Sequence, residues 1–236
     1  DFTSAVLTGA DLSGADLRGA TLSQADLSEA TLTRADLRGA KASGLIFSKG
    51  QLTGARFTEA DLRRATFMEA TLADVDYSGA DLESAIFFEA KGPRALFRGA
   101  RMRNVRFVNA CSFDGADFSR AILDESNLRG CSLVESDFTA ARMNRADLSE
   151  CDLRKAKLYR ASARDARFVR ANLAGAVMTS MDLMNGILQN ASLAGADLRG
   201  ANLFQADLSR VLRDAETNMK DANMTRACVR PARRPT

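Results

Sequence analysis

Three of the four cysteines recur at intervals of 20 residues, at Cys111, Cys131 and Cys151. A chain that returns to the same place every 20 residues would stack these thiols, and stacked thiols suggest disulfide formation or metal ligation. Parallel stacked side chains have the wrong mutual orientation for a disulfide. A tetrahedral metal site needs ligands that converge on a point, whereas stacked thiols lie along a line. We therefore interpret the three residues as a core thiol stack in which cysteine replaces alanine.

Other catalytic groups are scarce or belong to a pattern. The chain has no histidine, which excludes Ser-His-Asp and Cys-His nucleophiles and every histidine-containing metal site. Carboxylates are abundant, but they return at a fixed interval and so reflect a repeat rather than a catalytic pair. No glycine-rich phosphate loop stands between a strand and a helix. We expect no enzymatic activity, no cofactor and no metal.

The interval itself is the main feature of the sequence. A bulky residue, here called i, returns every five residues from Phe2 to Phe107 and again from Phe113 to Leu208. Of these 42 positions, all but three are Leu, Phe, Met or Tyr; the exceptions are Ala42, Gly92 and Ala163. Position i−2 is small except at Leu45 and Met181. A period this short and regular predicts a solenoid with i and i−2 inside and the charged positions i−1, i+1 and i+2 outside.

The repeat reads A-(D/N)-(L/F)-X-X, as in residues 10 to 14 (ADLSG) and 35 to 39 (ADLRG). It resembles the pentapeptide-repeat family over residues 1 to 208. The resemblance implies an all-β fold, a right-handed quadrilateral parallel β-helix in which four pentads form one coil. The 42 pentads then give about ten coils, and the rod would be roughly 50 Å long at about 4.8 Å per coil.

We expect one repeat domain over residues 1 to 208, with a register shift near 108–112 where one residue is inserted. Residues 209 to 236 leave the register and predict a C-terminal cap followed by a basic tail from Arg230 to Arg234. The repeat is already in register at Phe2, without the polar cap that solenoid ends need. This indicates that upstream sequence is missing and that the chain is part of a longer protein.

Composition sets limits on location and partners. No 18-residue apolar run and no secretory leader are present, so we expect no membrane span and a cytoplasmic location. Residues 1 to 90 carry a net charge of −6 and residues 91 to 236 carry +9. Because the basic residues spread over all four faces of the expected coil, we do not expect direct nucleic-acid binding.

One outward patch can be located by indexing. A predicted core ladder of i residues lies on one side of the rod, at Phe47, Phe67, Phe87 and Phe107. On the same side, five apolar residues take outward positions and form a candidate partner contact: Ile46, Met68, Ile86, Phe88 and Val108. Exposed apolar patches often mark partner surfaces. A protein partner of unknown identity, a homodimer and the missing upstream sequence are the alternative occupants.

The preferred hypothesis is a non-catalytic protein-interaction or scaffold rod of a larger bacterial protein. In arrangement the chain is similar to repeat segments of type VI secretion accessory proteins and of effectors delivered to another cell. The alternative that the family suggests is a DNA mimic that binds DNA gyrase and protects it from quinolones. Mimicry needs rows of uncompensated carboxylates, whereas Asp16 is followed by Arg18 and the net charge is positive. The acidic first 90 residues keep this alternative open.

Overall fold

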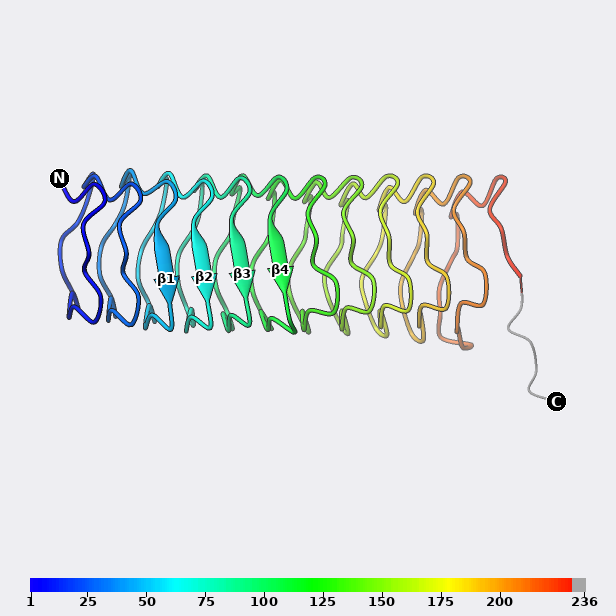
Figure 1. The fold of residues 1–236 in the computed structure, drawn as a ribbon. Coiled ribbons are helices and arrows are strands. Elements are labelled where there is room, and N and C mark those ends of the chain that lie inside the picture. Colours follow the sequence, from blue (N-terminus) through cyan, green and yellow to red (C-terminus); the bar gives the residue numbers. More distant parts are fainter. Residues whose placement is uncertain (231–236) are drawn as a thin grey trace.

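The computed structural model describes residues 1 to 230, which form a stack of coils with the two ends of the chain at opposite ends of the rod (Figure 1). Successive coils are joined by parallel bridges between residues 20 apart, such as Val6 with Asp26 and Asp26 with Ile46. No helix occurs in this described part of the chain. The predicted all-β repeat solenoid is therefore confirmed.

The longest paired segments are four three-residue strands on one side of the rod (Figure 1). They are β1 (Ile46–Ser48), β2 (Thr66–Met68), β3 (Ile86–Phe88) and β4 (Arg106–Val108). They form one parallel sheet in the order β1-β2-β3-β4, and each residue pairs with the residue 20 positions later. One strand per coil is thus aligned with the next without offset.

Most corners of the coil are tight turns. The N–H of Ala5 donates to the carbonyl of Phe2 at 3.0 Å, and the same bond recurs along the rod. The second central residue has positive φ, the feature of type II turns. Glycine serves at Gly9 (φ 69°), but Glu29 takes the same conformation (φ 58°). The Glu29 N–H donates to the carbonyl of Ser48 in the next coil at 2.7 Å, so coil-to-coil bonds hold a conformation that is unfavourable for a residue with a Cβ.

The interior is filled by the i and i−2 side chains, almost all of which are fully buried from Leu22 onward. Aromatic rings stack from coil to coil, with centroids 5.3 Å apart for Phe47 and Phe67, 4.7 Å for Phe67 and Phe87, and 4.8 Å for Phe87 and Phe107. Offset and edge contacts between rings add to the burial of their apolar area. The core is therefore a continuous ladder in which each coil packs only on its neighbours.

The register shift is absorbed at one corner. Asp81 pairs with Arg101, 20 residues on, whereas Lys91 pairs with Ser112, 21 residues on. The additional residue is accommodated in a bend at Asn109 and Ala110, which have successive positive φ angles of 56° and 49°. Beyond this bend the 20-residue spacing resumes.

A second extra residue enters between 213 and 217, since Ser192 pairs with Leu212 but Asp197 pairs with Asn218. The Asp214 carboxylate accepts hydrogen bonds from the N–H groups of Gly195 (2.9 Å) and Thr217 (3.0 Å). Parallel bridges then continue as far as Cys228. The predicted basic tail begins at Arg230, and the rest of it lies outside the described residues.

Outward aspartates at i−1 are tied to nearby donors. Asp16 and Arg18 form an ion pair at 2.7 Å, and the hydrogen bonds from Arg18 lower the pKa of Asp16 to about 2. The pKa is lowered in the same way by hydrogen bonds from Arg38 to Asp36 and from Arg199 to Asp197. Eleven aspartates along the rod have a lowered pKa.

These shifts predict how stability depends on pH. A carboxylate with a lowered folded-state pKa stabilises the fold above the unfolded value of 3.8, and this contribution is lost as pH falls through the folded-state value. The chain has no histidine to titrate between pH 5 and 8. We therefore expect a flat melting temperature from pH 7 to about 5 and a steep fall below about pH 4. Thermal unfolding followed by circular dichroism tests this, and a melting temperature that rises on acidification would contradict it.

Candidate functional site

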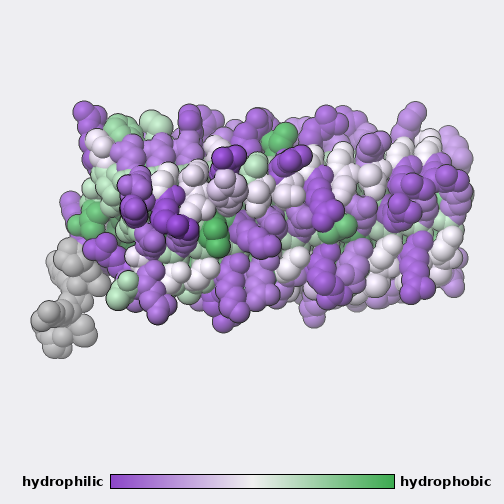
Figure 2. Space-filling model, turned by 180° about the vertical axis from the view of Figure 1, so that it is seen from behind, coloured by the Kyte–Doolittle hydropathy of each residue, from purple (hydrophilic) through white to green (hydrophobic). Residues whose placement is uncertain are grey.

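The sheet β1–β4 carries an outward apolar row. In its register Ser48 pairs with Met68, Met68 with Phe88, and Phe88 with Val108. Met68, Phe88 and Val108, here called the apolar ladder, occupy the same i+1 position in three successive coils. Met68 is 39% exposed, and Phe88 and Val108 are half-buried. The rod seen from behind is mainly hydrophilic, and away from its ends the apolar residues stand singly (Figure 2).

The local backbone explains why this row is in register. The neighbouring coils close the same corner with a hydrogen-bonded turn, in which Ala30 donates to Leu27 and Cys131 donates to Leu128, both at 3.1 Å. In β1–β4 the i+1 residue instead stays extended and pairs with the next strand. Side chains at i+1 are thereby held in line along the sheet.

The other predicted contact residues lie in a second outward row, on the opposite side of the inward phenylalanines. This row runs Ile46, Thr66, Ile86 and Arg106. Ile46 is 41% exposed, and Ile86 is half-buried. Thr66 therefore separates the two isoleucines, so the apolar ladder is the continuous part of the predicted patch.

A groove of about 460 Å³ lies beside the apolar ladder. The groove is lined by Glu69, Ala70, Thr71, Glu89, Lys91, Asn109 and Ala110, and it is called the acidic groove below. The Asn109 side-chain amide donates to the Glu89 carboxylate at 3.3 Å. The pentad pattern does not predict this groove; the available signal is the register shift, because the inserted Ala110 forms part of the groove wall.

The predicted core residues lie inside the rod. Phe47, Phe67, Phe87 and Phe107 are at most 2% exposed, which leaves them no role at the surface. Their rings pack beneath the sheet, and the outward rows lie on its other face.

The three stacked cysteines are buried and free. The Cys111 thiol donates to the carbonyl of Phe87 at 3.3 Å, and the Cys151 thiol donates to the carbonyl of Leu128 at 2.9 Å. Burial raises the pKa of Cys151 to about 12. The hydrogen bond between Cys111 and Cys131 raises the pKa of Cys131, as burial also does, and lowers that of Cys111. Because all three thiols are inaccessible to solvent, they are poor nucleophiles and poor metal ligands. No group of three or more ligating side chains suited to a metal ion occurs in residues 1 to 230.

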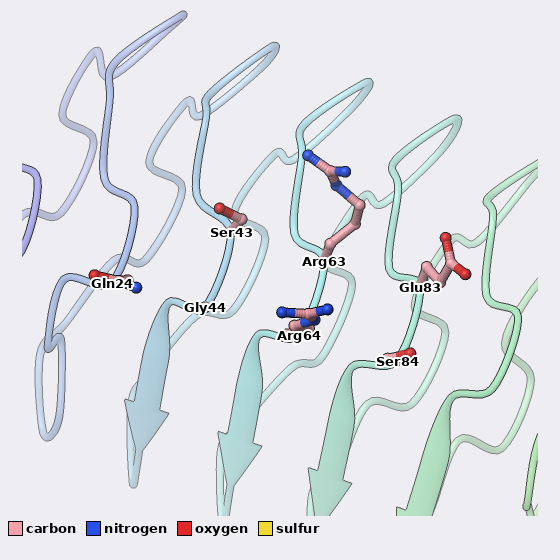
Figure 3. Close-up of a pocket in the computed structure, with 7 residues that line it drawn as sticks. All are labelled: Gln24, Ser43, Gly44, Arg63, Arg64, Glu83 and Ser84. Atoms are coloured by element: carbon pink, nitrogen blue, oxygen red, sulfur yellow. The ribbon is translucent and has the colours of Figure 1, made fainter.

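A second hollow, of about 410 Å³, lies along an edge of the rod next to β1–β3 (Figure 3). It is lined by Gln24, Ser43, Gly44, Arg63, Arg64, Glu83 and Ser84, which come from one corner of four successive coils. Arg63 is held by Asp61 at 2.6 Å. The charges are mixed and do not converge, so the arrangement offers no catalytic set.

The described part of the chain contains no helix of the length and apolarity needed to cross a membrane.

A family model described as a pentapeptide repeat region matches residues 100–178, and one described as pentapeptide repeats (8 copies) matches residues 1–24, 51–87 and 188–211. No curated protein sequence matches the chain.

Several solved structures are similar to this chain. HetL of the cyanobacterium Nostoc sp. strain PCC 7120, a pentapeptide repeat protein involved in heterocyst differentiation regulation, is 29% identical with a TM-score of 0.63, and the match covers 88% of this chain and 87% of HetL. A pentapeptide repeat protein of the Arabidopsis thaliana thylakoid lumen is 30% identical with a TM-score of 0.38, over 39% of this chain and 63% of that protein. QnrB1, a plasmid-mediated fluoroquinolone resistance protein, is 18% identical with a TM-score of 0.37, over 92% and 88%.

Proposed function

The chain belongs to the pentapeptide-repeat family, and from this we propose that it is a non-catalytic protein-interaction rod. The proposal assigns the β1–β4 side as its contact face. It also takes the rod to be a repeat domain of a larger bacterial protein, in which stacked coils hold the contact face rigid.

The observation that carries the proposal is the alignment of Met68, Phe88 and Val108 on consecutive strands. Solenoids tolerate single outward apolar residues, but three in register form a continuous strip on a rigid sheet. A rigid strip loses little conformational entropy on binding, so more of the buried apolar area contributes to affinity.

Two further observations support a binding role over a catalytic one. The three stacked cysteines are buried, and the hollow of Figure 3 contains only mixed surface charges. HetL, which is similar over most of its length, is a protein involved in regulation. A regulatory or scaffolding contact is consistent with that likeness.

Gyrase binding by DNA mimicry is the alternative that the charge pattern opposes. Asp36 is neutralised by Arg38 at 2.7 Å, and Asp152 by Arg154 at the same distance. Carboxylates paired in this way cannot imitate a row of phosphates. Supercoiling by purified DNA gyrase, with and without a quinolone, separates the two functions: inhibition or drug protection at micromolar protein would favour the mimic.

We expect the Phe88→Asp variant to fold normally and to lose contact with its partner. Phe88 is half-buried at the surface, so a carboxylate there reaches water, yet it would place a charge in the centre of an apolar contact. A loss of affinity of at least tenfold, or about 1.4 kcal/mol, is expected for a central contact residue. Affinity capture from the host and light scattering for self-association measure the contact, and thermal unfolding checks the fold.

Val177→Asp is the matched control for this variant. Val177 is 39% exposed and lies outside β1–β4. The Val177→Asp variant should bind the partner as tightly as the parent protein does. Unfolding of Phe88→Asp would show that Phe88 belongs to the core, and full binding by that variant would remove the apolar ladder from the contact face.

A further inference from the structure

Two carboxylates form a row beside the apolar ladder. Glu69 follows Met68 and Glu89 follows Phe88, so the register that pairs Met68 with Phe88 places both glutamates at the same corner of adjacent coils. Both are exposed and line the acidic groove. Neither is within 4 Å of a Lys or Arg nitrogen of residues 1 to 230, although 15 other carboxylates of that part are in such pairs. Lys91 lines the same groove, and Lys49 stands at the same corner one coil before Glu69, but neither forms an ion pair with these carboxylates. Adjacent like charges that are not ion-paired repel each other.

The same corner contains an unusual backbone. Glu69 and Glu89 have φ angles of 52° and 51°, as turn residues elsewhere in the rod do, but Asn109 is followed by a second left-handed residue, Ala110. Left-handed conformations of residues other than glycine are costly. Both residues of the bend line the wall of the groove at the end of the apolar ladder.

Apolar and acidic rows side by side define the chemistry of a complementary partner. We infer that the β1–β4 face binds a protein segment that presents a basic side chain next to an apolar one. The cation sits between the carboxylates of Glu69 and Glu89, and the apolar side chain packs against Met68 and Phe88. This inference rests on the proposed function and specifies its partner. Nucleic acid does not fit, because phosphates would be repelled by the two carboxylates.

Carboxylates without an ion pair leave this part of the groove free to accept a cation from the partner. An intramolecular cation between them would have to be displaced by the partner, at a cost in affinity. Complementary charge also raises the rate of association and selects against acidic partners. The apolar ladder provides the buried area, and the groove provides selectivity.

The test is selection of seven-residue peptides from a random library on the full chain. We expect the selected peptides to place Lys or Arg beside Leu, Ile, Phe or Tyr. Their dissociation constants, measured by fluorescence anisotropy with synthetic labelled peptides, should rise at least about tenfold for the double variant Glu69→Lys/Glu89→Lys. They should also rise as salt is increased.

The matched control is Glu59→Lys/Glu216→Lys. It makes the same change in net charge at two exposed turn carboxylates that line neither the acidic groove nor the apolar ladder. Peptide affinity should stay within about twofold, because distant exposed charges are largely screened. Glu69→Gln/Glu89→Gln separates loss of attraction from new repulsion, and it should weaken binding less than the lysine pair does.

The outcomes separate this inference from the proposed function. If Phe88→Asp abolishes peptide binding and the lysine pair does not, the contact face remains and the basic partner is wrong. If neither variant changes binding, both proposals fail. Acidic selected peptides, a selection without enrichment, or an equal loss in the control pair would each overturn the inference. Melting temperatures equal to that of the parent establish that the variants are folded.

Discussion

The Phe67→Asp variant is expected to lose the cooperative unfolding transition of the parent. Phe67 is fully buried, its ring stacks on Phe47 and Phe87 at 5.3 and 4.7 Å, and it meets Tyr77 edge-on at 5.8 Å. Removing a buried phenylalanine costs about 3–5 kcal/mol, and a buried carboxylate without a partner adds a large penalty. Together these approach the whole stability of a typical domain, about 5–15 kcal/mol.

The position of Phe67 increases the effect. Each coil contacts only its neighbours, so a broken coil in the middle separates the stack into two shorter rods. Urea denaturation and circular dichroism measure the loss. Phe67→Leu is the control, since leucine fills most i positions, and it should retain the fold at a cost of about 1–2 kcal/mol. A native melting temperature for Phe67→Asp would refute the assignment of the core.

Much of this fold follows from the sequence because the five-residue period leaves few alternatives. A bulky residue every fifth position and a small one two before it can share an interior only if the chain turns at each pentad. The prediction for Phe47 and Phe67 came from that period, and so did the alignment of Met68 with Phe88. Neighbours in adjacent coils can be predicted by counting along the chain, because stacked residues are 20 positions apart wherever no residue is inserted.

The exceptions to the period show where packing between coils makes a local adjustment. Ala42 is undersized at its i position, and Leu45, which donates its N–H to the Ala42 carbonyl at 3.2 Å, is oversized at the adjacent i−2 position. Both are fully buried, so volume lost at one position is restored at the next, as close packing requires. Such compensation depends on which residues meet in space, so a repeat pattern cannot reveal it.

The candidate site was only partly predictable for the same reason. The outward apolar residues could be predicted from their positions in the repeat. The extended corners of β1–β4 could not, because the five-residue pattern does not determine whether a corner is a hydrogen-bonded turn or stays extended. Phe57 is an i residue, as Phe47 is, yet it begins a hydrogen-bonded turn in which the N–H of Ala60 donates to the Phe57 carbonyl at 3.0 Å. The acidic groove likewise depends on how the insertion at Ala110 is accommodated.

Placing leucine, the commonest i residue, at position 92 in place of glycine is expected to destabilise the rod. The backbone of Gly92 is not left-handed, so an L-residue could adopt it, but an added Cβ would clash with Cε1 of Phe113 and lie 2.7 Å from its Cδ1. That ring is wedged edge-on against Phe87 and Phe107, with centroids 5.6 and 5.1 Å away. Gly92→Leu is therefore expected to cost about 3 kcal/mol or more by overpacking.

The double variant Gly92→Leu/Phe113→Leu tests the cause of this loss, because it gives both coils the usual leucine. It should be more stable than Gly92→Leu alone, with a coupling free energy of about 0.5–3 kcal/mol in a double-mutant cycle measured by urea denaturation. Gly99→Ala is the contrasting control: an added Cβ there meets nothing within 4 Å, and φ is 62°, so only backbone strain of about 1–2 kcal/mol is expected. If the two leucine substitutions changed the free energy of unfolding additively, the Phe113 ring would not be the reason that a side chain is disfavoured at position 92. Coupling of the expected sign would show that the missing side chain of Gly92 makes room for a ring from the next coil.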